Sequence, residues 1–326
     1  MSAAETTATS SVSRRRFAVF SGARRRRTVV PRYLPYLLIT PALLVLGLVI
    51  LYPLVDLVLI SFQKFRAREL ISGLPVSWVG LDNYRYVLGQ DEFRESLVRT
   101  LLFTAVNVAL TMGLGLAIAL MLRRLGPRMR LLVTTSMVLA WAIPIVTATQ
   151  VWQWMFDRDY GVVNWALGGL HLGDFNQHSW LSNPVSLLTV ATVIVVWGAV
   201  PFVALTLFAA LTQIPDDLYE AARVDGANAW SQLRSITLPL LAPVFLVLAL
   251  LSTIWDFRVF TQVFVLQKSG GTSDTTNLLG IWAYHQAFGG APNYGRGAAT
   301  SAVGVAILLI VTALAVRRMV REGERT

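Results

Sequence analysis

Side chains that carry catalytic or metal-binding chemistry are sparse in this sequence. It contains no cysteine, which excludes disulfides, thiolate metal sites and a cysteine nucleophile. Its three histidines, His171, His178 and His285, are scattered without metal-ligand spacing. Neither of its two lysines lies in a G-x-x-x-x-G-K-[ST] loop, so the chain binds no nucleotide through that motif. Because no Ser-His-Asp or paired-carboxylate arrangement is recognisable, we expect no catalytic residue, no metal site and no bound cofactor.

A second group of candidates consists of polar and aromatic side chains inside long apolar runs. A charge at the centre of a membrane helix costs about 2.5–3.5 kcal/mol, so each such residue invites a functional explanation. Aromatic faces together with a few hydrogen-bonding groups suit a sugar, and five residues are therefore candidates for lining a solute path: Asn107, Gln150, Trp197, Trp255 and Asp256. For Trp255 and Asp256 the alternative is hydrogen bonding between helices. Trp152 and Trp154 are typical of aromatic residues at a bilayer interface.

The composition places these residues in a membrane protein. Of the 326 residues 55% are hydrophobic and only 14% are charged, whereas a soluble domain carries about 25% charged residues. The net charge of +10 lies in short tracts beside apolar runs and not on the face of a folded domain, which argues against nucleic acid as a partner. The sequence therefore predicts an all-α polytopic membrane protein.

Apolar stretches bounded by charge, glycine or proline predict six membrane-spanning helices, at about 34–62, 97–122, 131–156, 185–211, 240–266 and 297–316. In the fifth, Asp256 and Arg258 are two residues apart and cannot pair on one helical face, so each needs another partner or water. Residues 1–33 predict a disordered basic tail near anionic lipid, and 318–326 a short cytoplasmic tail.

The positive charge predicts the orientation, because positively charged flanks are retained in the cytoplasm. Eighteen of the 28 Lys and Arg residues lie in the two tails, the 123–130 turn and the 212–239 loop. The opposite segments, 63–96, 157–184 and 267–296, hold eight. Both termini are therefore expected in the cytoplasm.

The three opposite segments are too small to be domains. The string D-E-F-R-E-S at 91–96 predicts a small surface helix leading into the second span, with its acids at the positive end of the helix dipole. The 157–184 loop suits an amphipathic turn of helix on the membrane surface. The third segment is rich in Gly and Thr near Gly271 and Thr272 and regains amphipathic character at 282–288.

The most specific pattern lies in the cytoplasmic loop at 212–239. Pro215 followed by Asp216 and Asp217 predicts the start of a helix, and Gly226 predicts its end. A second helical piece should follow, with Leu238-Pro239 marking the point where the chain re-enters the membrane.

This loop resembles the EAA loop of binding-protein-dependent ABC importer permeases of type I. The fixed positions of that motif are all present: Glu220, Ala221, Ala222, Asp225, Gly226, Ala227, Ile236, Leu238 and Pro239. Leu233 stands where the sugar branch more often has Phe, a conservative apolar change. Weaker motifs at 38–46, 79–84 and 160–164 are similar to the carbohydrate-uptake branch, in particular to the first permeases of maltose-type and glycerol-phosphate-type systems.

The resemblance implies a type I ABC importer permease fold, with the transmembrane domain at 97–317, in a bacterial cell membrane. In relatives the EAA segment is a coupling helix that docks on the cytoplasmic ATPase. The residues expected to couple are Asp217, Glu220, Ala221, Ala222, Asp225, Gly226 and Ala227. Glu220 would be a polar docking contact, Gly226 the turn, and the alanines the small residues that permit close approach.

The same resemblance implies the partners. They are a second, homologous permease that completes a heterodimer, a pair of ABC ATPases that use ATP and Mg²⁺, an extracytoplasmic solute-binding protein, and a carbohydrate cargo.

The alternative function is that of an ion-coupled secondary transporter or channel for a small polar solute. Such a protein would use coupling carboxylates near the midplane, and Asp256 is the only acid well inside a predicted span. A membrane enzyme would need clustered His or acidic residues in the spans, and the sequence has none.

Overall fold

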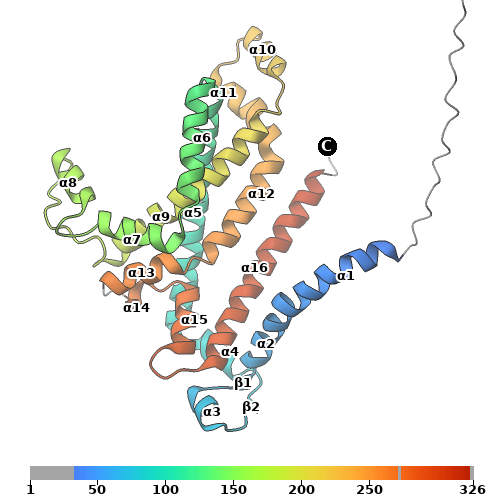
Figure 1. Cartoon of the computed structure of the whole chain (residues 1–326), viewed down its shortest axis with the longest axis vertical. Helices are drawn as coiled ribbons and strands as arrows, with labels where there is room; N and C mark the ends of the chain where they lie inside the picture. The colour runs from blue at the N-terminus through green and yellow to red at the C-terminus, as the bar shows by residue number, and fades with distance from the viewer. Residues whose placement is uncertain (1–32, 271–272, 324–326) are drawn as a thin grey trace, which may run out of the picture. The chain divides into compact units, whose positions relative to one another are not determined.

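A computed structural model describes residues 33–270 and 273–323, which are almost entirely helical (Figure 1). The predicted tail at 1–33 lies outside the described residues except for its last position, as do Gly271, Thr272 and the end of the 318–326 tail. The chain divides after Tyr52 into two compact units, which are described separately below.

The first unit contains α1 (Leu34–Leu46) and a π-helical turn, η1 (Gly47–Leu51). The helix α2 (Tyr52–Ser61) follows. Residues Tyr36–Ser61 are long and apolar enough to cross a membrane, with a mean hydropathy of 2.7. This segment coincides with the first predicted span in position and length.

The second unit is built around three long helical segments. These are α5 (Asp91–Arg124), α9 (Pro184–Leu211) and a segment at 229–270, which together with α16 (Tyr294–Gly323) are also long and apolar enough to cross a membrane. Five of the six predicted spans therefore coincide with helices of suitable length in the part of the chain that the structure describes.

The third predicted span, at 131–156, is wrong as a single straight helix. The chain there forms α6 (Pro127–Trp141) and α7 (Ile145–Met155), which are bent by 100° at a short break. The break falls at Pro144, whose ψ of 132° is extended and whose ring nitrogen has no hydrogen to donate. The pair is either one broken span, which makes six, or a re-entrant element.

The helices α5 and α9 form the central packed pair of this unit, and Gly115 permits their close approach. A Cβ atom built on Gly115 would lie 2.6 Å from Val203 Cγ1 of α9, closer than real side chains come. Buried Met112, Val203 and Leu207 continue the contact, and Leu241 and Leu248 join it from α12. Small residues at such contacts let membrane helices pack through van der Waals attraction.

The segment at 229–270 differs from the predicted fifth span. It consists of α11 (Ala229–Gln232), a π-helical turn η2 (Leu233–Thr237), α12 (Leu238–Phe257) and α13 (Thr261–Gly270). The helix does not break at Leu238-Pro239, although the residue before a proline is biased away from the α region: Leu238 is helical and its N–H bonds to Leu233 O across the π turn. In a π turn each N–H bonds to the carbonyl five residues before it instead of four. This wider turn lets the helix continue past Pro239, which has no N–H to donate.

The predicted span at 240–266 is also interrupted, since α12 ends at Phe257 and α13 begins at Thr261. Arg258 is exposed at this break, while Phe257 and Val259 on either side of it are buried.

One end of the second unit carries several short elements. The strands β1 (Gln63–Lys64) and β2 (Ser77–Trp78) pair antiparallel, with Gln63 opposite Trp78, around α3 (Ala67–Ser72). The helix α4 (Asp82–Gly89) precedes α5. The helix start predicted at 91–96 is confirmed, but it is not a small helix of its own: α5 begins at Asp91 and continues into the span, and no glycine or proline interrupts it before Gly113.

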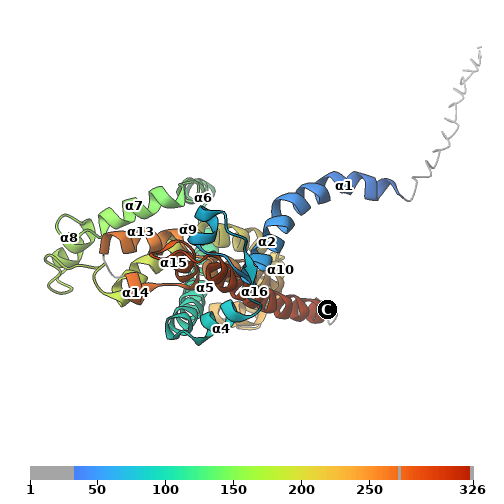
Figure 2. The same cartoon turned by 90° about the horizontal axis from the view of Figure 1, so that it is seen from below.

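The two remaining loops hold helices, which were predicted for the 157–184 loop only. The 157–184 loop contains α8 (Val162–Gly169), and 273–288 contains α14 (Ser273–Thr276) and α15 (Leu279–Phe288). Figures 1 and 2 both place α7, α8, α13 and α14 on one side of the α5–α9 pair. Buried residues of α9 and α13, with Phe156 and Ile281, form the core beneath them.

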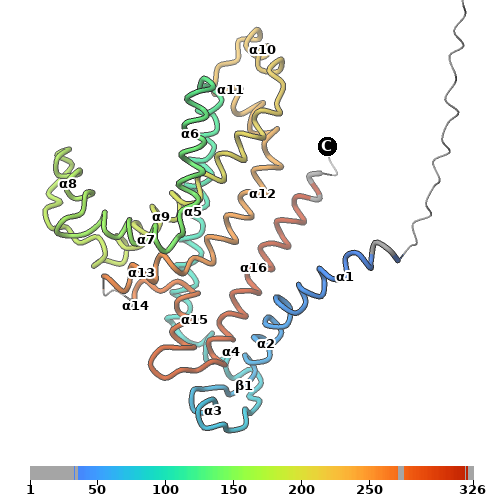
Figure 3. Tube along the Cα trace, in the orientation of Figure 1, coloured from blue at the N-terminus to red at the C-terminus, as the bar shows by residue number. Residues whose placement is uncertain are grey.

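The helix α10 (Asp216–Val224) lies at the opposite end of this unit from α3 and α4 (Figure 3). The helix α5 connects the two ends, α9 and α12 run from the α10 end to the level of α7 and α13, and α16 runs from the α4 end toward the α10 end. The loop with the EAA pattern and the short elements β1, β2, α3 and α4 therefore lie at opposite ends of this unit.

Candidate functional site

The EAA pattern forms the helix α10 and the turn that follows it. Asp216 and Asp217 occupy its first turn, where their charge faces the positive end of the helix dipole. Gly226 follows the helix with a φ of +82°, in the left-handed region that glycine adopts without steric cost. The Ala227 N–H donates to Ala222 O over 2.8 Å, which closes the last turn as a Schellman motif. The predicted start and end of this helix are confirmed.

The residues predicted to couple lie mostly on the surface. Five are exposed and two are half-buried; the exposed ones are Asp217, Glu220, Ala221, Asp225 and Gly226, and the half-buried ones are Ala222 and Ala227. Two apolar side chains of the same helix are exposed among them, Leu218 by 45% and Val224 by 88%. An exposed mixture of acidic, small and apolar side chains is suited to contact with another protein.

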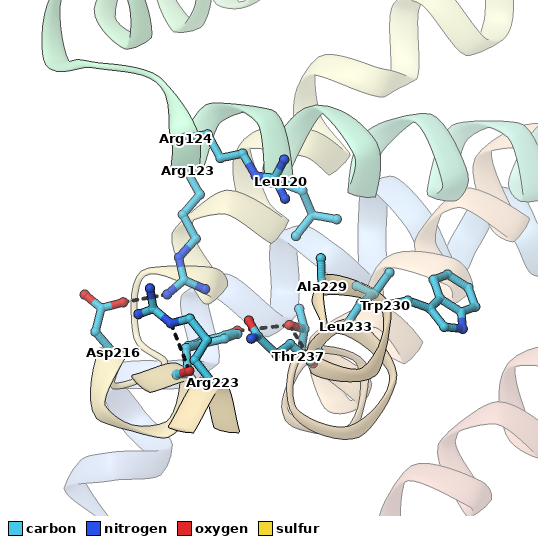
Figure 4. Close-up of a pocket in the computed structure, with 11 residues that line it drawn as sticks. Leu120, Arg123, Arg124, Asp216, Arg223, Ala229, Trp230, Leu233 and Thr237 are labelled. Carbon is cyan, nitrogen blue, oxygen red and sulfur yellow. Dashed lines mark hydrogen bonds and ion pairs between the residues drawn. The ribbon is translucent and has the colours of Figure 1, made fainter. Parts of the chain in front are cut away.

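Four residues attach α10 to the spanning helices, and we call them the α10 anchor: Arg123, Asp216, Tyr219 and Thr237. Arg123 Nη2, at the end of α5, donates to Asp216 Oδ1 over 2.6 Å, and its guanidinium lies 4.1 Å from the centre of the Tyr219 ring. The Tyr219 hydroxyl shares a 3.0 Å hydrogen bond with the Thr237 hydroxyl of η2. Figure 4 shows Arg123 pointing from α5 toward Asp216.

A cavity of about 480 Å³ lies beside the α10 anchor, between α5, α10 and α11 (Figure 4). Leu120, Arg124, Arg223 and Trp230 contribute to its lining together with the anchor residues. Sequence reasoning missed this arrangement. Arg123 and Asp216 are 93 residues apart, so no local pattern pairs them.

The five predicted path residues lie in different surroundings. Asn107 is fully buried between α5 and α9, with its Nδ2 donating to Phe103 O over 2.7 Å and to Thr192 Oγ1 over 3.5 Å. Asp256 is 3% exposed in the last turn of α12, and among the described residues its buried Oδ2 has no hydrogen-bond partner. Gln150 is exposed on α7.

The two tryptophans of that set each join an aromatic group. Trp197 packs edge-on against Trp152 with ring centres 5.8 Å apart. Trp255 is 45% exposed and packs edge-on against Phe202 at 5.4 Å, and Phe202 in turn stacks on Trp141. Hydrogen bonding between helices, the alternative for Trp255 and Asp256, finds no partner for Asp256 Oδ2 in the described part of the chain.

An apolar groove of about 770 Å³ lies between α5, α6 and α9. Trp152, Trp197, Met137 and Thr192 are among the residues that line it. Of the two tryptophans assigned to the bilayer interface, Trp154 is 64% exposed, whereas Trp152 packs against the buried core.

Two of the three histidines contribute to packing in the described structure. His178 packs edge-on against Trp180 with ring centres 4.7 Å apart, and His285 packs against Tyr284. In residues 33–270 and 273–323, no three or more His, Asp or Glu side chains gather as metal ligands.

Comparison with known proteins identifies the class of this architecture. Residues 109–322 match the family described as "Binding-protein-dependent transport system inner membrane component". The chain is 43% identical over 290 residues to the diacetylchitobiose uptake system permease protein DasB of Streptomyces coelicolor, covering 89% of this chain and 88% of that protein. It is 36% identical to the trehalose/maltose transport system permease protein MalF of Thermococcus litoralis, covering 86% and 91%.

Solved structures confirm the fold. A chain of a bacterial ABC transporter involved in the import of the acidic polysaccharide alginate superposes with a TM-score of 0.75 at 22% identity, covering 89% of this chain and 96% of that chain. A second structure, of the alginate transporter in complex with its pentasaccharide-bound periplasmic protein, gives a TM-score of 0.68 at 20% identity, covering 87% and 92%. With the helical architecture and α10 at one end of the spanning helices, these matches show that the chain belongs to the inner membrane permeases of binding-protein-dependent transport systems.

Proposed function

We propose that this chain is the permease subunit of an ATP-driven importer of a sugar or short oligosaccharide, and that ATP hydrolysis on a partner subunit is coupled to transport through α10. One observation carries the proposal most directly. The EAA pattern forms an exposed helix that lies beyond the ends of the spanning helices and is attached to two of them, α5 and α12, by side chains.

The cargo class is supported by the relatives, which are permeases of diacetylchitobiose, trehalose or maltose, and sulfoquinovosyl glycerol systems. The shared chemistry of these names is a sugar with many hydroxyl groups. Trp197 and Trp255 offer aromatic faces of the kind that sugars stack on, and Asn107, Gln150 and Asp256 offer hydrogen-bonding groups. We assign these five residues to the solute path, which a second permease would complete.

The roles in coupling follow from the exposure of the motif. Glu220 presents a carboxylate for a charged contact with the ATPase. The small side chains on that face project little from the helix, so a cleft on the partner can close around α10; they are Ala221, Ala222 and Ala227. Asp217 and Asp225 extend the acidic surface at the two ends of the helix, and Gly226 turns the chain away from it.

The assembly that this function needs has four kinds of partner. A second, homologous permease faces this one, two ATPase subunits bind α10 and its counterpart and use ATP with Mg²⁺, and a solute-binding protein docks at the end with α3 and α4. Both termini then lie on the ATPase side, as the distribution of Lys and Arg predicts.

The experiment is uptake into proteoliposomes that contain the purified complex and its binding protein. Radiolabelled diacetylchitobiose, trehalose and maltose are offered in turn, with ATP, with ADP, or with a proton or sodium gradient alone. The proposal predicts uptake of at least one of these sugars that requires ATP. Uptake driven by an ion gradient without ATP would contradict it and favour a secondary transporter.

A further inference from the structure

The attachment of α10 to the rest of the chain passes through very few side chains. In the described part of the chain, every hydrogen bond, ion pair and ring contact between α10 and another helix involves Arg123 or Tyr219. Tyr219 is also the residue of α10 that is buried in the core of α5, α9 and α12. The neighbouring cavity of about 480 Å³ leaves the rest of this side of α10 without close packing.

Arg123 makes its two contacts in a geometry that fixes the orientation of α10. Asp216 and Tyr219 are three residues apart, so they lie on the same face of the helix, one turn from each other. A single guanidinium holds both, the carboxylate by a hydrogen bond and the ring by its face. Rotation of α10 about its axis therefore breaks at least one of the two contacts.

The end of α5, which carries Arg123, is itself held in place by Arg130. Arg130 of α6 donates from Nε to Leu122 O over 3.1 Å and from Nη2 to Leu125 O over 2.9 Å, which caps the last turn of α5. Its guanidinium also lies 5.3 Å from the centre of the Phe208 ring of α9. A displacement of Arg123 therefore moves α5, α6 and α9 together.

On its other side the α10 anchor reaches α12. The Tyr219 hydroxyl bonds to Thr237, the last residue of the π turn η2, and Thr237 is 2% exposed. The helix α12 continues directly from this turn and carries Trp255 and Asp256 at its far end. Two spanning helices are thus connected to α10 through one arginine and one tyrosine.

We propose that the α10 anchor is the mechanical link of this permease: Arg123 and Tyr219 are positioning residues that convert a movement of α10 into a movement of α5 and α12. This inference rests on the proposed function, since it assumes that an ATPase moves α10. The anchor residues do not touch the ATPase in this account. When the anchor residues are removed, the ATPase should still dock and hydrolyse ATP, but this hydrolysis should no longer drive transport.

The test measures sugar taken up per ATP hydrolysed, in proteoliposomes with the cognate second permease, ATPase and binding protein. The sugar is whichever of diacetylchitobiose, trehalose or maltose the wild-type complex transports. Arg123→Ala and Tyr219→Phe are compared with Arg124→Ala, which removes the adjacent exposed arginine of the same cavity. The anchor variants should assemble and hydrolyse ATP at near wild-type rates but lose most of the uptake per ATP, with Arg123→Ala the more severe. Arg124→Ala should keep the wild-type ratio.

A covalent replacement separates a mechanical role from a merely structural one. Because the chain has no cysteine, the double variant Arg123→Cys/Asp216→Cys has only these two thiols. It should be uncoupled when reduced, and a short bifunctional thiol reagent that bridges the two residues should restore uptake per ATP. The reduced variant should still assemble and hydrolyse ATP at near wild-type rates, whereas loss of a merely structural contact would lower assembly and ATP hydrolysis together with uptake.

Two results would overturn the link. One is a wild-type ratio of uptake to ATP in Arg123→Ala, and the other is loss of all uptake when the bridge is closed, which would mean that α10 and α5 must separate during transport. Both are distinct from failure of the proposed function, in which the wild-type complex itself shows no ATP-dependent uptake.

Discussion

Gly226 shows how one residue shapes the surface that α10 presents. Its φ of +82° lies where a side chain with a Cβ is strained, although no atom lies within 4 Å of the position that a Cβ would occupy. The constraint is thus purely on the backbone. It is worth about 1–2 kcal/mol for most residues and less for Asn, whose short polar side chain tolerates this region.

This predicts an order of activity at position 226. ATP-driven uptake should fall from wild type to Gly226→Asn, then to Gly226→Ala, and should be lost in Gly226→Pro, because proline fixes φ near −65°. Uptake is measured at equal amounts of assembled complex. Equal uptake in the Asn, Ala and Pro variants would show that the turn after α10 does not matter for coupling.

Trp255 offers a second test at this scale, because 45% of it is exposed next to Phe202 and close in sequence to Asp256. Trp255→Ala removes an aromatic face of the assigned path, so the KM for sugar uptake should rise while ATP hydrolysis by the complex persists. The matched control is Trp154→Ala on α7, which is 64% exposed and is assigned to the bilayer interface. An equal effect of both changes would remove Trp255 from the path.

At the scale of elements, the contact between α5 and α9 depends on small side chains. A Cβ at Gly115 meets Val203 Cγ1 at 2.6 Å, whereas a Cβ at Gly113 on the same helix meets nothing within 4 Å. The two glycines thus form a matched pair. They have the same helix propensity and differ in the space beside them.

Gly115→Ala should therefore lower the stability of the purified permease by about 1–3 kcal/mol through overpacking, and Gly113→Ala should not lower it. Adding Val203→Ala to Gly115→Ala should recover part of the loss, because it vacates the colliding atom. Thermal unfolding in detergent measures all four proteins. A lower melting temperature for Gly113→Ala than for Gly115→Ala would contradict this packing.

The elements also show what the sequence predicts and what it does not. The start of α10 after Pro215 and its end before Gly226 follow from local capping rules, so both were predictable. Pro144 also signalled a break, but the long apolar run around it favoured one straight span. At Leu238-Pro239 the proline favoured a break, whereas the helix continues there through a π turn.

The anchor contact between Arg123 and Asp216 was not predictable, because it joins residues that only the packing of α5 with its neighbours brings together. The surroundings of Asp256 could not be predicted from the sequence either. Its position near the end of an apolar run was visible in the sequence, whereas its burial without a partner for Oδ2 depends on tertiary structure.

For the whole molecule, orientation in the membrane is the first property to establish. In the proposed orientation Gln213, just before α10, lies in the cytoplasm and Ser72, at the end of α3, lies outside; both residues are exposed. Single-cysteine variants at these positions have one thiol each, because the natural chain has none. A membrane-impermeant thiol reagent should label Ser72→Cys in intact cells and Gln213→Cys only after permeabilisation. The reverse pattern would invert the topology.

In the proposed coupling the energy of ATP enters this chain through α10, and charge reversal at Glu220 tests this most directly. The measurement is ATP-driven sugar uptake in proteoliposomes for wild type, Glu220→Lys and the control Gln213→Lys, which places the same charge on a neighbouring exposed residue outside the motif. We expect Glu220→Lys to insert normally and lose uptake, and Gln213→Lys to retain it. Uptake in Glu220→Lys equal to wild type would contradict the claim.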